Sequence, residues 1–359
     1  MRTWVCGVRS LLVVSLLAAL PSLVFAQGDK RSFKVEQFPG GVCAVVSTDP
    51  LGLANHSNAV FIIGNDDVIV VDTQFTLART REVLDMLRTL THKPVSTVIN
   101  THWHDDHTFG NQVYAEAFPS AEFIAQENTR EAMETIAVSN REAQVAGGED
   151  AVALFRECVT SGNSLAGTPM SDEEKAAYTS TADIARQYLD EQKNFRAVLP
   201  TRTFKDHLAL TQGTRVVELH WFGPAATRGD AVVYLPVERV LIAGDIIDNP
   251  VPFAYGCDTD GWIAALDSVA ALNPAVIIPG HGEPVSIAQV QSLRASLASL
   301  RDAAREAARS GVSIEQALAG DVAAGVEKQM AGENAMLRFL CENYFIGPVM
   351  KSAANSMAN

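Results

Sequence analysis

The 359-residue sequence predicts an α/β protein in which two β-sheets are sandwiched between helices. The first observation behind this prediction is that short β-branched segments alternate with helical segments in both halves of the chain. The second is a charged, alanine-rich region at about residues 126–196, whose helical texture indicates an insertion between the halves. With 47% hydrophobic residues, the chain can bury a sizeable core.

The first half predicts a hairpin, a helix and a further strand, in that order. Residues 58–72, NAVFIIGNDDVIVVD, hold two β-branched runs around a Gly-Asn-Asp-Asp turn, which is typical of a hairpin of buried strands. A helix is expected over 77–90, because its apolar residues fall on one face, and Pro94 ends it before a strand at 95–100. A histidine-rich loop therefore follows directly after a strand.

The second half repeats the alternation and ends in helices. Strands are expected at 214–223, 231–236, 239–247 and 275–282, with a helix at 262–272. Inside the insertion, Ser171 followed by Glu174 predicts the start of a helix. Residues 286–359 form a predicted helical segment that packs on the domain of residues 27–285. The apolar stripe of this segment comprises Val290, Leu293, Leu297, Leu300 and Ala304.

The first 26 residues predict a cleaved signal peptide and hence a periplasmic or secreted protein. Arg2 and Arg9 precede an apolar run, Leu11 to Leu20, and a small-residue cleavage site ends at Ala26. An uncleaved membrane anchor is the alternative, but the apolar run is short for a membrane span. No stable anchor is therefore expected.

Cysteines add little to this prediction. Cys43, Cys158, Cys257 and Cys341 form no Cys-x-x-Cys pair, so the sequence predicts neither a zinc ribbon nor a redox motif. Disulfides and buried free thiols both stay open.

The charge balance excludes one class of partner. Without Arg2 and Arg9, 26 basic residues stand against 42 acidic ones, a formal charge of −16. A polyanion would be repelled by such a surface, so nucleic acid is not an expected partner. A small-molecule substrate is expected instead, and the oligomeric state stays open.

Residues 100–111, NTHWHDDHTFGN, are the strongest candidate for a functional site. In an extended loop the side chains of His102, His104 and Asp106 would point the same way, while His107 turns to an adjacent position. This geometry fits two neighbouring cations, with His102 and His104 on one and Asp106 and His107 on the other. Imidazole and carboxylate ligands together favour zinc over calcium or magnesium.

This His-x-His-x-Asp-His motif after a strand resembles the signature of the metallo-β-lactamase superfamily of metallohydrolases. Later segments match the family in order: VVDTQ with Asp72, GPAATRGDAVVYLP, LIAGDII with Asp245, and IPGHGEP with His281. The resemblance covers about residues 42–284. It implies a four-layer αββα sandwich with the metals at one edge of the sheets, Asp245 serving both metal sites and His281 completing the second.

The sequence departs from the family at Ala226, where the resemblance implies a histidine of the first metal site. That site keeps His102, His104 and Asp245, and the loss of one of four ligands would cost roughly 3 kcal/mol, about a hundredfold in affinity, if the ligands contributed equally. One zinc ion is therefore expected at Asp106, His107 and His281, with the other site weakened. His220, six residues earlier, is expected to be an ordinary strand histidine.

The resemblance implies an exported zinc-dependent hydrolase of an amide- or ester-like bond, with a β-lactam as the leading substrate class. Asp106 would be the catalytic residue, orienting a metal-activated water. A thioesterase or lactonase is one alternative, because the fold does not fix the substrate. A metal-binding accessory protein, with catalysis weakened or lost through Ala226, is another.

Plainer roles are expected for other residues near these motifs. His56 and His207 are expected to be solvated loop histidines, with a place at the pocket mouth as the alternative. Asp105 is expected to be exposed. Trp103 and Phe109 are expected to pack in the core, with a place in the substrate-pocket wall as the alternative. The remaining acids, Asp72 and Asp230, are expected to brace loops by hydrogen bonds.

Overall fold

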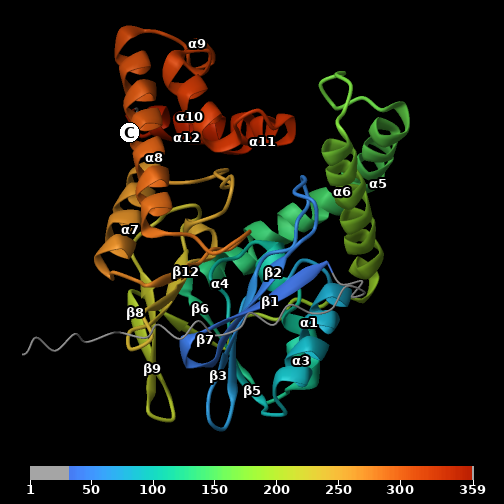
Figure 1. The fold of residues 1–359 in the computed structure, drawn as a ribbon, viewed down its shortest axis with the longest axis vertical. Helices are drawn as coiled ribbons and strands as arrows, with labels where there is room; N and C mark the ends of the chain where they lie inside the picture. Colours follow the sequence, from blue (N-terminus) through green and yellow to red (C-terminus); the bar gives the residue numbers. More distant parts are fainter. Residues whose placement is uncertain (1–31, 358–359) are drawn as a thin grey trace, which may run out of the picture.

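The structure is a computed structural model, and it describes residues 32–357. Two β-sheets pack face to face with helices on both outer sides, so the sandwich has four layers (Figure 1). The predicted fold class is confirmed. The expected signal peptide, residues 1–26, lies outside the described residues. No helix within residues 32–357 is long and apolar enough to cross a membrane.

The larger sheet has seven strands that lie side by side in chain order. They are β1 (Phe33–Phe38), β2 (Val42–Ser47), β3 (Ala59–Ile63), β4 (Val68–Val71), β5 (Val95–Ile99), β6 (Glu122–Gln126) and β7 (Arg202–Phe204). Pairing is antiparallel from β1 to β4 and parallel from β4 to β7. The carboxyl ends of β4 and β5 therefore meet at one edge, where Asp72 and the histidine-rich loop follow them.

The smaller sheet has five strands in the order β12, β11, β10, β9, β8. Their bounds are β8 (His207–Gln212), β9 (Arg215–Trp221), β10 (Ala231–Leu235), β11 (Val240–Ile242) and β12 (Val276–Ile278). Because β11 and β12 are parallel, Asp245 and His281, which follow them, also emerge at one edge. Valine, isoleucine and leucine side chains from both sheets fill the interface between the sheets.

Helices cover the outer face of each sheet. Short α3 (Asn111–Ala117) and α1 (Leu77–Leu90) pack on the larger sheet, and α7 (Thr259–Ala271) and α8 (Ile287–Ser310) pack on the smaller one. The helix α1 has the predicted bounds, and the Thr76 side chain caps it by accepting a hydrogen bond from the Arg79 amide.

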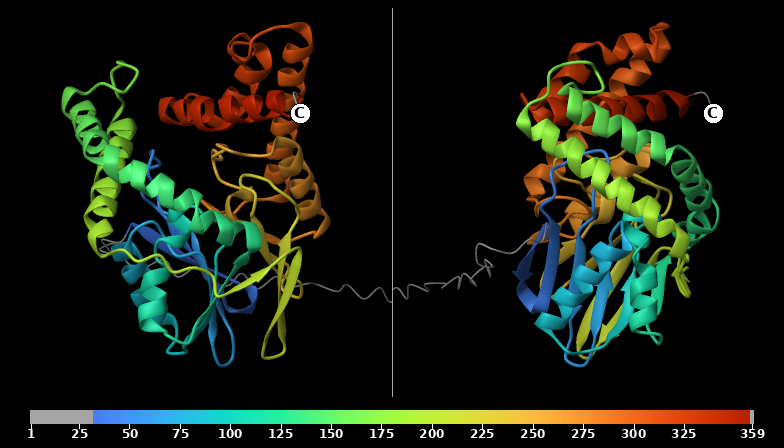
Figure 2. Two further views of the ribbon diagram at one scale, coloured as in Figure 1. Left: turned by 180° about the vertical axis from the view of Figure 1, so that it is seen from behind. Right: turned by 90° about the vertical axis from the view of Figure 1, so that its right-hand side faces the viewer.

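Three helices lie between β6 and β7, where the sequence predicts an insertion. They are α4 (Glu127–Glu134), α5 (Ile136–Ser161) and α6 (Asp172–Glu191), followed by the 3₁₀ turn η2 (Gln192–Asn194). As predicted, Ser171 caps α6, and it forms a reciprocal capping box with Glu174. In the views of Figures 1 and 2, α5 and α6 extend beyond one end of the sandwich.

The C-terminal helices extend beyond the same end of the sandwich (Figure 2). After α8 come α9 (Ile314–Leu318), α10 (Asp321–Ala331), α11 (Ala335–Leu340), a π-helical turn η4 (Cys341–Ile346) and α12 (Gly347–Asn355). The predicted apolar stripe of α8 is buried along its whole length. Side chains of α11, Met336 and Leu340, pack in one cluster with Met170 and Tyr178 of the insertion. The insertion and the C-terminal helices thus meet each other.

The four cysteines within residues 32–357 are all buried. Cys43, Cys158, Cys257 and Cys341 are buried free thiols. Burial raises the pKa of Cys43 to about 11. Of the two options that the sequence leaves open, the structure has free thiols.

Candidate metal centre

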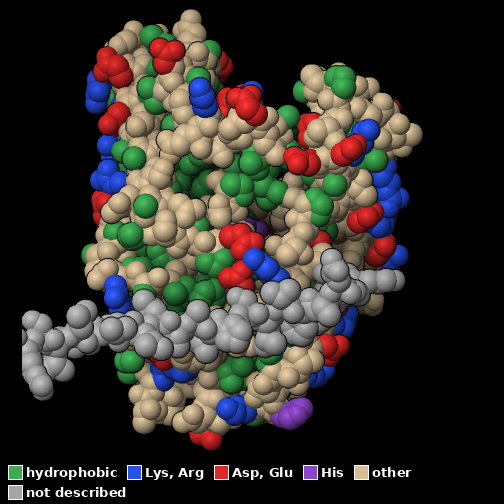
Figure 3. All heavy atoms as spheres, viewed as in Figure 1, with side chains coloured by type: hydrophobic (Ala, Val, Ile, Leu, Met, Phe, Trp, Pro, Cys, Tyr) green, Lys and Arg blue, Asp and Glu red, His purple; other side chains and the backbone are tan. Residues whose placement is uncertain are grey.

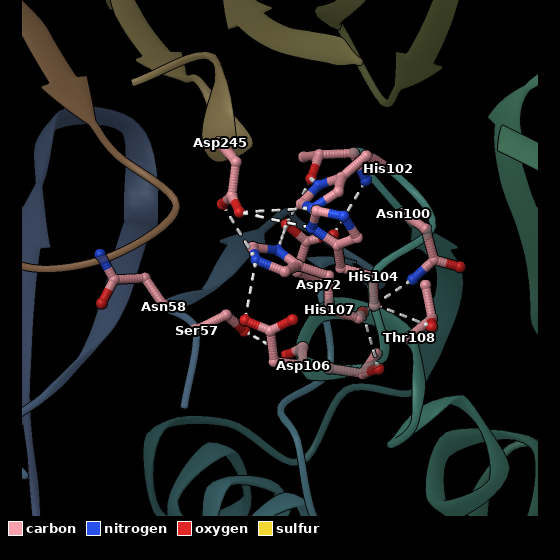
Figure 4. Close-up of polar contacts among 12 residues, drawn as sticks. Ser57, Asn58, Asp72, Asn100, His102, His104, Asp106, His107, Thr108 and Asp245 are labelled. Atoms are coloured by element: carbon pink, nitrogen blue, oxygen red, sulfur yellow. Dashed lines mark hydrogen bonds and ion pairs between the residues drawn. The ribbon is translucent and has the colours of Figure 1, made fainter. Parts of the chain in front are cut away.

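Loops from both sheets meet at one edge of the sandwich and bring the six predicted ligand residues together. His102, His104, Asp106 and His107 follow β5, Asp245 follows β11, and His281 follows β12. Figure 4 shows Asp245 reaching from the smaller sheet towards the three histidines of the larger sheet. His107 and His281, which are 174 residues apart in the chain, therefore lie in one cluster, at an edge that the strand directions determine.

The loop after β5 is not extended, and this expectation was wrong. Asp105–Thr108 forms one helical turn, α2, with two aspartates in the first turn, where carboxylates are favoured. Because of this turn, Asp106 and His107 lie on the side of His281. Nε2 of His102 is 2.9 Å from Nδ1 of His104, and the ring centroid of His102 is 4.2 Å from that of His107, so His102 adjoins both histidines.

Asp245 lies between the two sides of the cluster. Its Oδ2 is 3.4 Å from Nε2 of His102 and 3.9 Å from Nδ1 of His104. Its Oδ1 is 3.0 Å from Nε2 of His107 and 3.8 Å from Nε2 of His281. Oδ1 is buried and accepts no hydrogen bond from any described residue. One carboxylate thus faces four imidazoles, as expected for a residue that serves two metal positions.

The cluster contains two overlapping groups with the spacing of a metal site. One group is His102, His107 and Asp245, and the other is Asp106, His107 and His281; within each group the ligand atoms lie within 4.8 Å of one another. In the second group, Nε2 of His281 is 3.3 Å from Nε2 of His107 and 2.9 Å from Oδ2 of Asp106. Imidazole nitrogens and carboxylate oxygens that converge in this way fit a divalent cation, and this mixed donor set suits zinc.

Asp72 fixes the orientation of His107. The carboxylate accepts hydrogen bonds at 2.8 Å from the amide and the hydroxyl of Thr101, and it lies 2.8 Å from Nδ1 of His107. With Nδ1 directed at Asp72, Nε2 of His107 faces the cluster. The backbone of Asp72 is in the left-handed region, with φ of 59°, an uncommon conformation that this network holds in place. Asp72 therefore braces the loop, as predicted.

A glycine makes room for Asp245. A Cβ atom on Gly280 would lie 2.0 Å from Oδ1 of Asp245 and 2.8 Å from the carbonyl carbon of Gly244. Any side chain at position 280 would displace this carboxylate, so the glycine of IPGHGEP has a steric reason to precede His281.

The charges in the cluster shift its pKa values in opposite directions. Burial lowers the pKa of His281, but Asp245 and Asp106 outweigh burial and raise this pKa to about 9. Burial likewise opposes charge on His107, but Asp245 and Asp72 raise its pKa well above the usual value. Burial disfavours ionised Asp245, but His107 and His102 hold its pKa well below the usual value. Without a bound cation, protons on the His107 and His281 imidazoles therefore offset the negative charge of the carboxylates.

Cation binding is expected to displace these protons, so zinc affinity should rise with pH. His281 is protonated below a pH of about 9, and a metal ligand must be the neutral imidazole. If one proton leaves with each zinc bound, the affinity rises about tenfold per pH unit below pH 9. Zinc titrations in weakly coordinating buffers between pH 6 and 8 measure this slope. An affinity that does not change over that interval would contradict the assignment of His281.

Exchange of Asp72 for asparagine tests its role in orienting His107. Asparagine keeps the size and tolerates the left-handed backbone, but it lacks the charge that holds the Nδ1 proton. We expect Asp72→Asn to weaken zinc binding by about 10- to 100-fold. The matched control is Asp85→Asn, at a side chain that is 71% exposed. Equal zinc affinity of the two variants would show that Asp72 does not orient a ligand.

Ala226 is buried beside the cluster, and within residues 32–357 no imidazole replaces the missing one. It lines a cavity of about 360 Å³ together with His104 and Trp103. His220 lies in β9, where its Nε2 is 3.0 Å from Oε2 of Glu218 and its ring is next to His207. His220, Glu218 and His207 have the spacing of a metal group of their own, separate from the cluster.

Some residues near the cluster have their expected roles, and others do not. His56 is buried rather than solvated, its Nδ1 has no hydrogen-bond partner among the described residues, and burial lowers its pKa to about 3. His207 is exposed, but it begins β8 instead of lying in a loop. Trp103 lines the main cavity, while Phe109 is in the core as expected. Asp230 accepts a hydrogen bond from the amide of Thr227, as predicted.

Asp105 is mostly buried, which contradicts the expectation of an exposed side chain. Its carboxylate lies 3.0 Å from the Nε of Arg141 in α5 and accepts a hydrogen bond of 2.6 Å from the Tyr188 hydroxyl in α6. The inserted helices are thus attached to the histidine motif through Asp105. Sequence reasoning missed this link because it joins residues 36 and 83 positions apart.

The cluster forms part of the wall of a cavity of about 690 Å³ between the insertion, the C-terminal helices and the sandwich. Asp106, Asp245 and His281 line it on one side, and side chains of α5, α6 and η4 line the others. In Figure 3, a hollow opens between the two helical parts, with apolar side chains on its walls and histidine atoms at its floor. A ligand in the cavity would reach the cluster directly.

Asp248 also lines this cavity, and sequence reasoning missed it. It follows Asp245 by three residues in the segment GDIID, and burial together with the charge of Asp245 raises its pKa well above the usual value. The three-residue spacing of Asp245 and Asp248 did not predict this arrangement, because residues 239–247 were expected to form a strand. The chain instead forms the 3₁₀ turn η3 (Gly244–Ile246), and both carboxylates lie near His281.

An αββα sandwich with converging histidines and aspartates at one edge defines a metallohydrolase architecture. The chain belongs to the metallo-beta-lactamase superfamily, whose family model matches residues 53–281. Members of this superfamily are metal-dependent hydrolases, and a divalent-metal site is the role that the clustered residues fit.

Curated relatives include two enzymes of different names. A linear primary-alkylsulfatase of Pseudomonas sp. (strain ATCC 19151) is 30% identical over 231 residues, which is 62% of this chain but 40% of that protein. A metallo-beta-lactamase type 2 of Bacteroides fragilis is 22% identical over 233 residues, 63% of this chain and 69% of that protein.

Solved structures share the fold at low sequence identity. The metallo-beta-lactamase from Pontibacter korlensis has a TM-score of 0.51 at 17% identity, over 74% of this chain and 98% of that one. VMB-1 has a TM-score of 0.51 at 13% identity, over 76% of this chain and 99% of that one. These similarities establish the fold, but they do not identify the substrate, which has to be inferred from the residues of the site.

Proposed function

We propose that the protein is an exported, zinc-dependent hydrolase that cleaves an ester-like bond of a small molecule carrying an apolar group. The observation that carries this proposal is a cluster of four imidazoles and two carboxylates, of which His104, His281 and both carboxylates line a large cavity. A divalent cation bound there would acidify a water molecule and polarise the bond to be cleaved. The basic and apolar residues of the first 26 positions support export.

Asp106 is the residue that we assign to orienting the attacking water. Its side chain is 22% exposed and lines the cavity, with Oδ2 at 2.9 Å from Nε2 of His281. Burial opposes its ionisation, but the charges of His107 and His281 lower its pKa below the usual value. At neutral pH it is therefore an ionised hydrogen-bond acceptor, as a group that positions water must be.

The cavity lining supports an apolar group in the substrate. Apolar side chains from four parts of the chain contribute to it: Leu51, Leu53, Trp103, Val251, Phe253 and Leu340. None of the described residues that line the cavity is a lysine or an arginine. The relative that is 30% identical is named a linear primary-alkylsulfatase, which supports an alkyl group as the apolar part.

A β-lactam is the second candidate, and the shared fold with solved metallo-beta-lactamases favours it. The carboxylate of a β-lactam would find no cationic side chain in this lining, so recognition would depend on the bound metal alone. For this reason the geometry favours an ester with an apolar chain.

A substrate panel on the zinc-loaded protein tests the proposal. The panel comprises short-chain and long-chain nitrophenyl esters, a long-chain alkyl sulfate and a chromogenic β-lactam, each with and without chelator. We expect chelator-sensitive hydrolysis with kcat/KM at least about tenfold higher for the long-chain than for the short-chain ester. Preferred turnover of the β-lactam would establish the second candidate. If no substrate of the panel is turned over, the result would instead support a metal-binding accessory protein without catalytic activity.

A further inference from the structure

Asp248 is a buried carboxylate in the wall of the main cavity, next to the metal centre. Its side chain is 8% exposed, and its Oδ1 has no hydrogen-bond partner among the described residues. A buried carboxylate oxygen without a donor is costly, so a native protein normally supplies a hydrogen-bond donor or a cation at such an oxygen. The feature therefore requires an explanation.

The position of Asp248 points to a cation. Asp248, Asp245 and His281 form a third group whose ligand atoms lie within 4.8 Å of one another. Oδ1 of Asp245, which also accepts no hydrogen bond, lies 3.8 Å from Nε2 of His281. Two neighbouring carboxylates that share no donor repel each other unless a proton or a cation lies between them.

The backbone around Asp248 is held firmly against the His281 loop. The amide of Asn249 donates a hydrogen bond of 3.1 Å to the carbonyl of His281, and its side chain donates one of 3.2 Å to the carbonyl of Glu283. A Cβ atom on Gly282 would lie 2.0 Å from the carbonyl oxygen of Asn249, so the two loops are in close contact. A ligand carried by such a braced segment needs little ordering when it binds a metal.

We infer that Asp248 is a further ligand of the metal centre, adding a carboxylate on the side of Asp245 and His281. The inference rests on the metal centre of the proposed function and deepens it. Ala226 leaves the His102 and His104 side without one imidazole, whereas Asp248 gives the opposite side a ligand beyond Asp106, His107 and His281. Zinc, which accepts both imidazole and carboxylate, is the cation that this set suits.

The competing explanation is a proton shared between Asp248 and Asp245, and Asp248→Asn separates the two. Asparagine has the shape of protonated aspartic acid and can donate a hydrogen bond to Asp245, so it would preserve a structural role. It would not replace a carboxylate ligand. Zinc affinity and the absorption spectrum of the cobalt-substituted protein are the readouts, and neither depends on turnover.

All proteins in this experiment carry His207→Ala and His220→Ala, so that the separate surface group cannot bind the added metal. Asp49→Asn is the matched control, since the Asp49 side chain is 11% exposed, pairs with Arg79 and belongs to none of the ligand groups. Circular dichroism establishes that each variant is folded.

We expect Asp248→Asn to weaken the tightest zinc site about a hundredfold and to change the cobalt spectrum, while Asp49→Asn changes neither. Zinc affinity and a cobalt spectrum equal to those of the parent protein would overturn the inference and establish the shared proton. A parent protein that binds no zinc would overturn the metal centre and the proposed function together. The parent measurement therefore distinguishes the two failures.

Discussion

Replacement of Asp245 by asparagine is expected to remove most bound zinc and to reduce hydrolysis to the level seen with chelator. Asp245 lies within 3.9 Å of all four clustered histidines, through Oδ2 on one side and Oδ1 on the other. Loss of one ligand in four costs roughly 3 kcal/mol, or about a hundredfold in affinity. Because Asp245 serves both sides, the loss falls on both metal positions.

The measurement is zinc content after dialysis against a metal buffer, followed by the rate on the best substrate of the panel. Asp267→Asn, at a side chain 57% exposed on α7, is the control and should retain both. Gly280 packs closely against the Asp245 side chain, and because asparagine is isosteric with aspartate, the variant tests charge without changing this packing. Full zinc content in Asp245→Asn would show that this carboxylate is not a ligand.

Replacement of Ala226 by histidine is expected to strengthen metal binding. The cavity of about 360 Å³ that Ala226 and His104 line offers room for an imidazole next to the His102 and His104 pair. A third imidazole there would restore the weakened position, with a gain of about a hundredfold in affinity. We expect Ala226→His to bind one more zinc per chain than the parent and to hydrolyse its substrate faster.

Ala226→Phe is the matched control, because it fills the same space with a ring that has no ligand nitrogen. Equilibrium zinc titration of the three proteins separates ligation from packing. If Ala226→His binds no more zinc than Ala226→Phe, the first metal position does not lie where the family resemblance places it.

The strands β3 to β5 and β9 to β12 were predictable because their signals are local. β-branched runs mark these strands, Pro94 marks the end of a helical segment and Ser171 marks a helix start. Once the parallel strands are placed, Asp72, the histidine motif, Asp245 and His281 must emerge at the same edge. The position of the cluster in the fold therefore follows from the strand order.

Other elements carry weaker local signals. The strands β1, β2, β6, β7 and β8 were not among the predicted elements; β7 is short, and β8 alternates between exposed and half-buried residues along a sheet edge. The turn α2 was missed because a run of histidine and aspartate has no periodically spaced apolar residues, although its two aspartates favour a helix start.

The exposure of individual side chains depended on contacts between distant segments. Asp105 is buried because Arg141 and Tyr188 of the insertion reach it, and His56 is buried although it lies in a loop. Asp248 lies at the cluster because a 3₁₀ turn replaces the expected strand. In addition, Gly282 has no side chain, so the backbone of Asn249 can pack against the His281 loop. None of these contacts leaves a periodic pattern in the sequence.

Equilibrium titration with zinc of the metal-free parent protein and of His107→Ala measures whether the clustered histidines and aspartates bind a metal ion. His107 belongs to both the His102–Asp245 group and the Asp106–His281 group, and its Nε2 is 3.0 Å from Asp245 and 3.3 Å from His281. We expect at least one tightly bound zinc per chain in the parent and an affinity at least about a hundredfold lower in His107→Ala. Equal zinc binding by the two proteins, or none by either, would contradict this expectation.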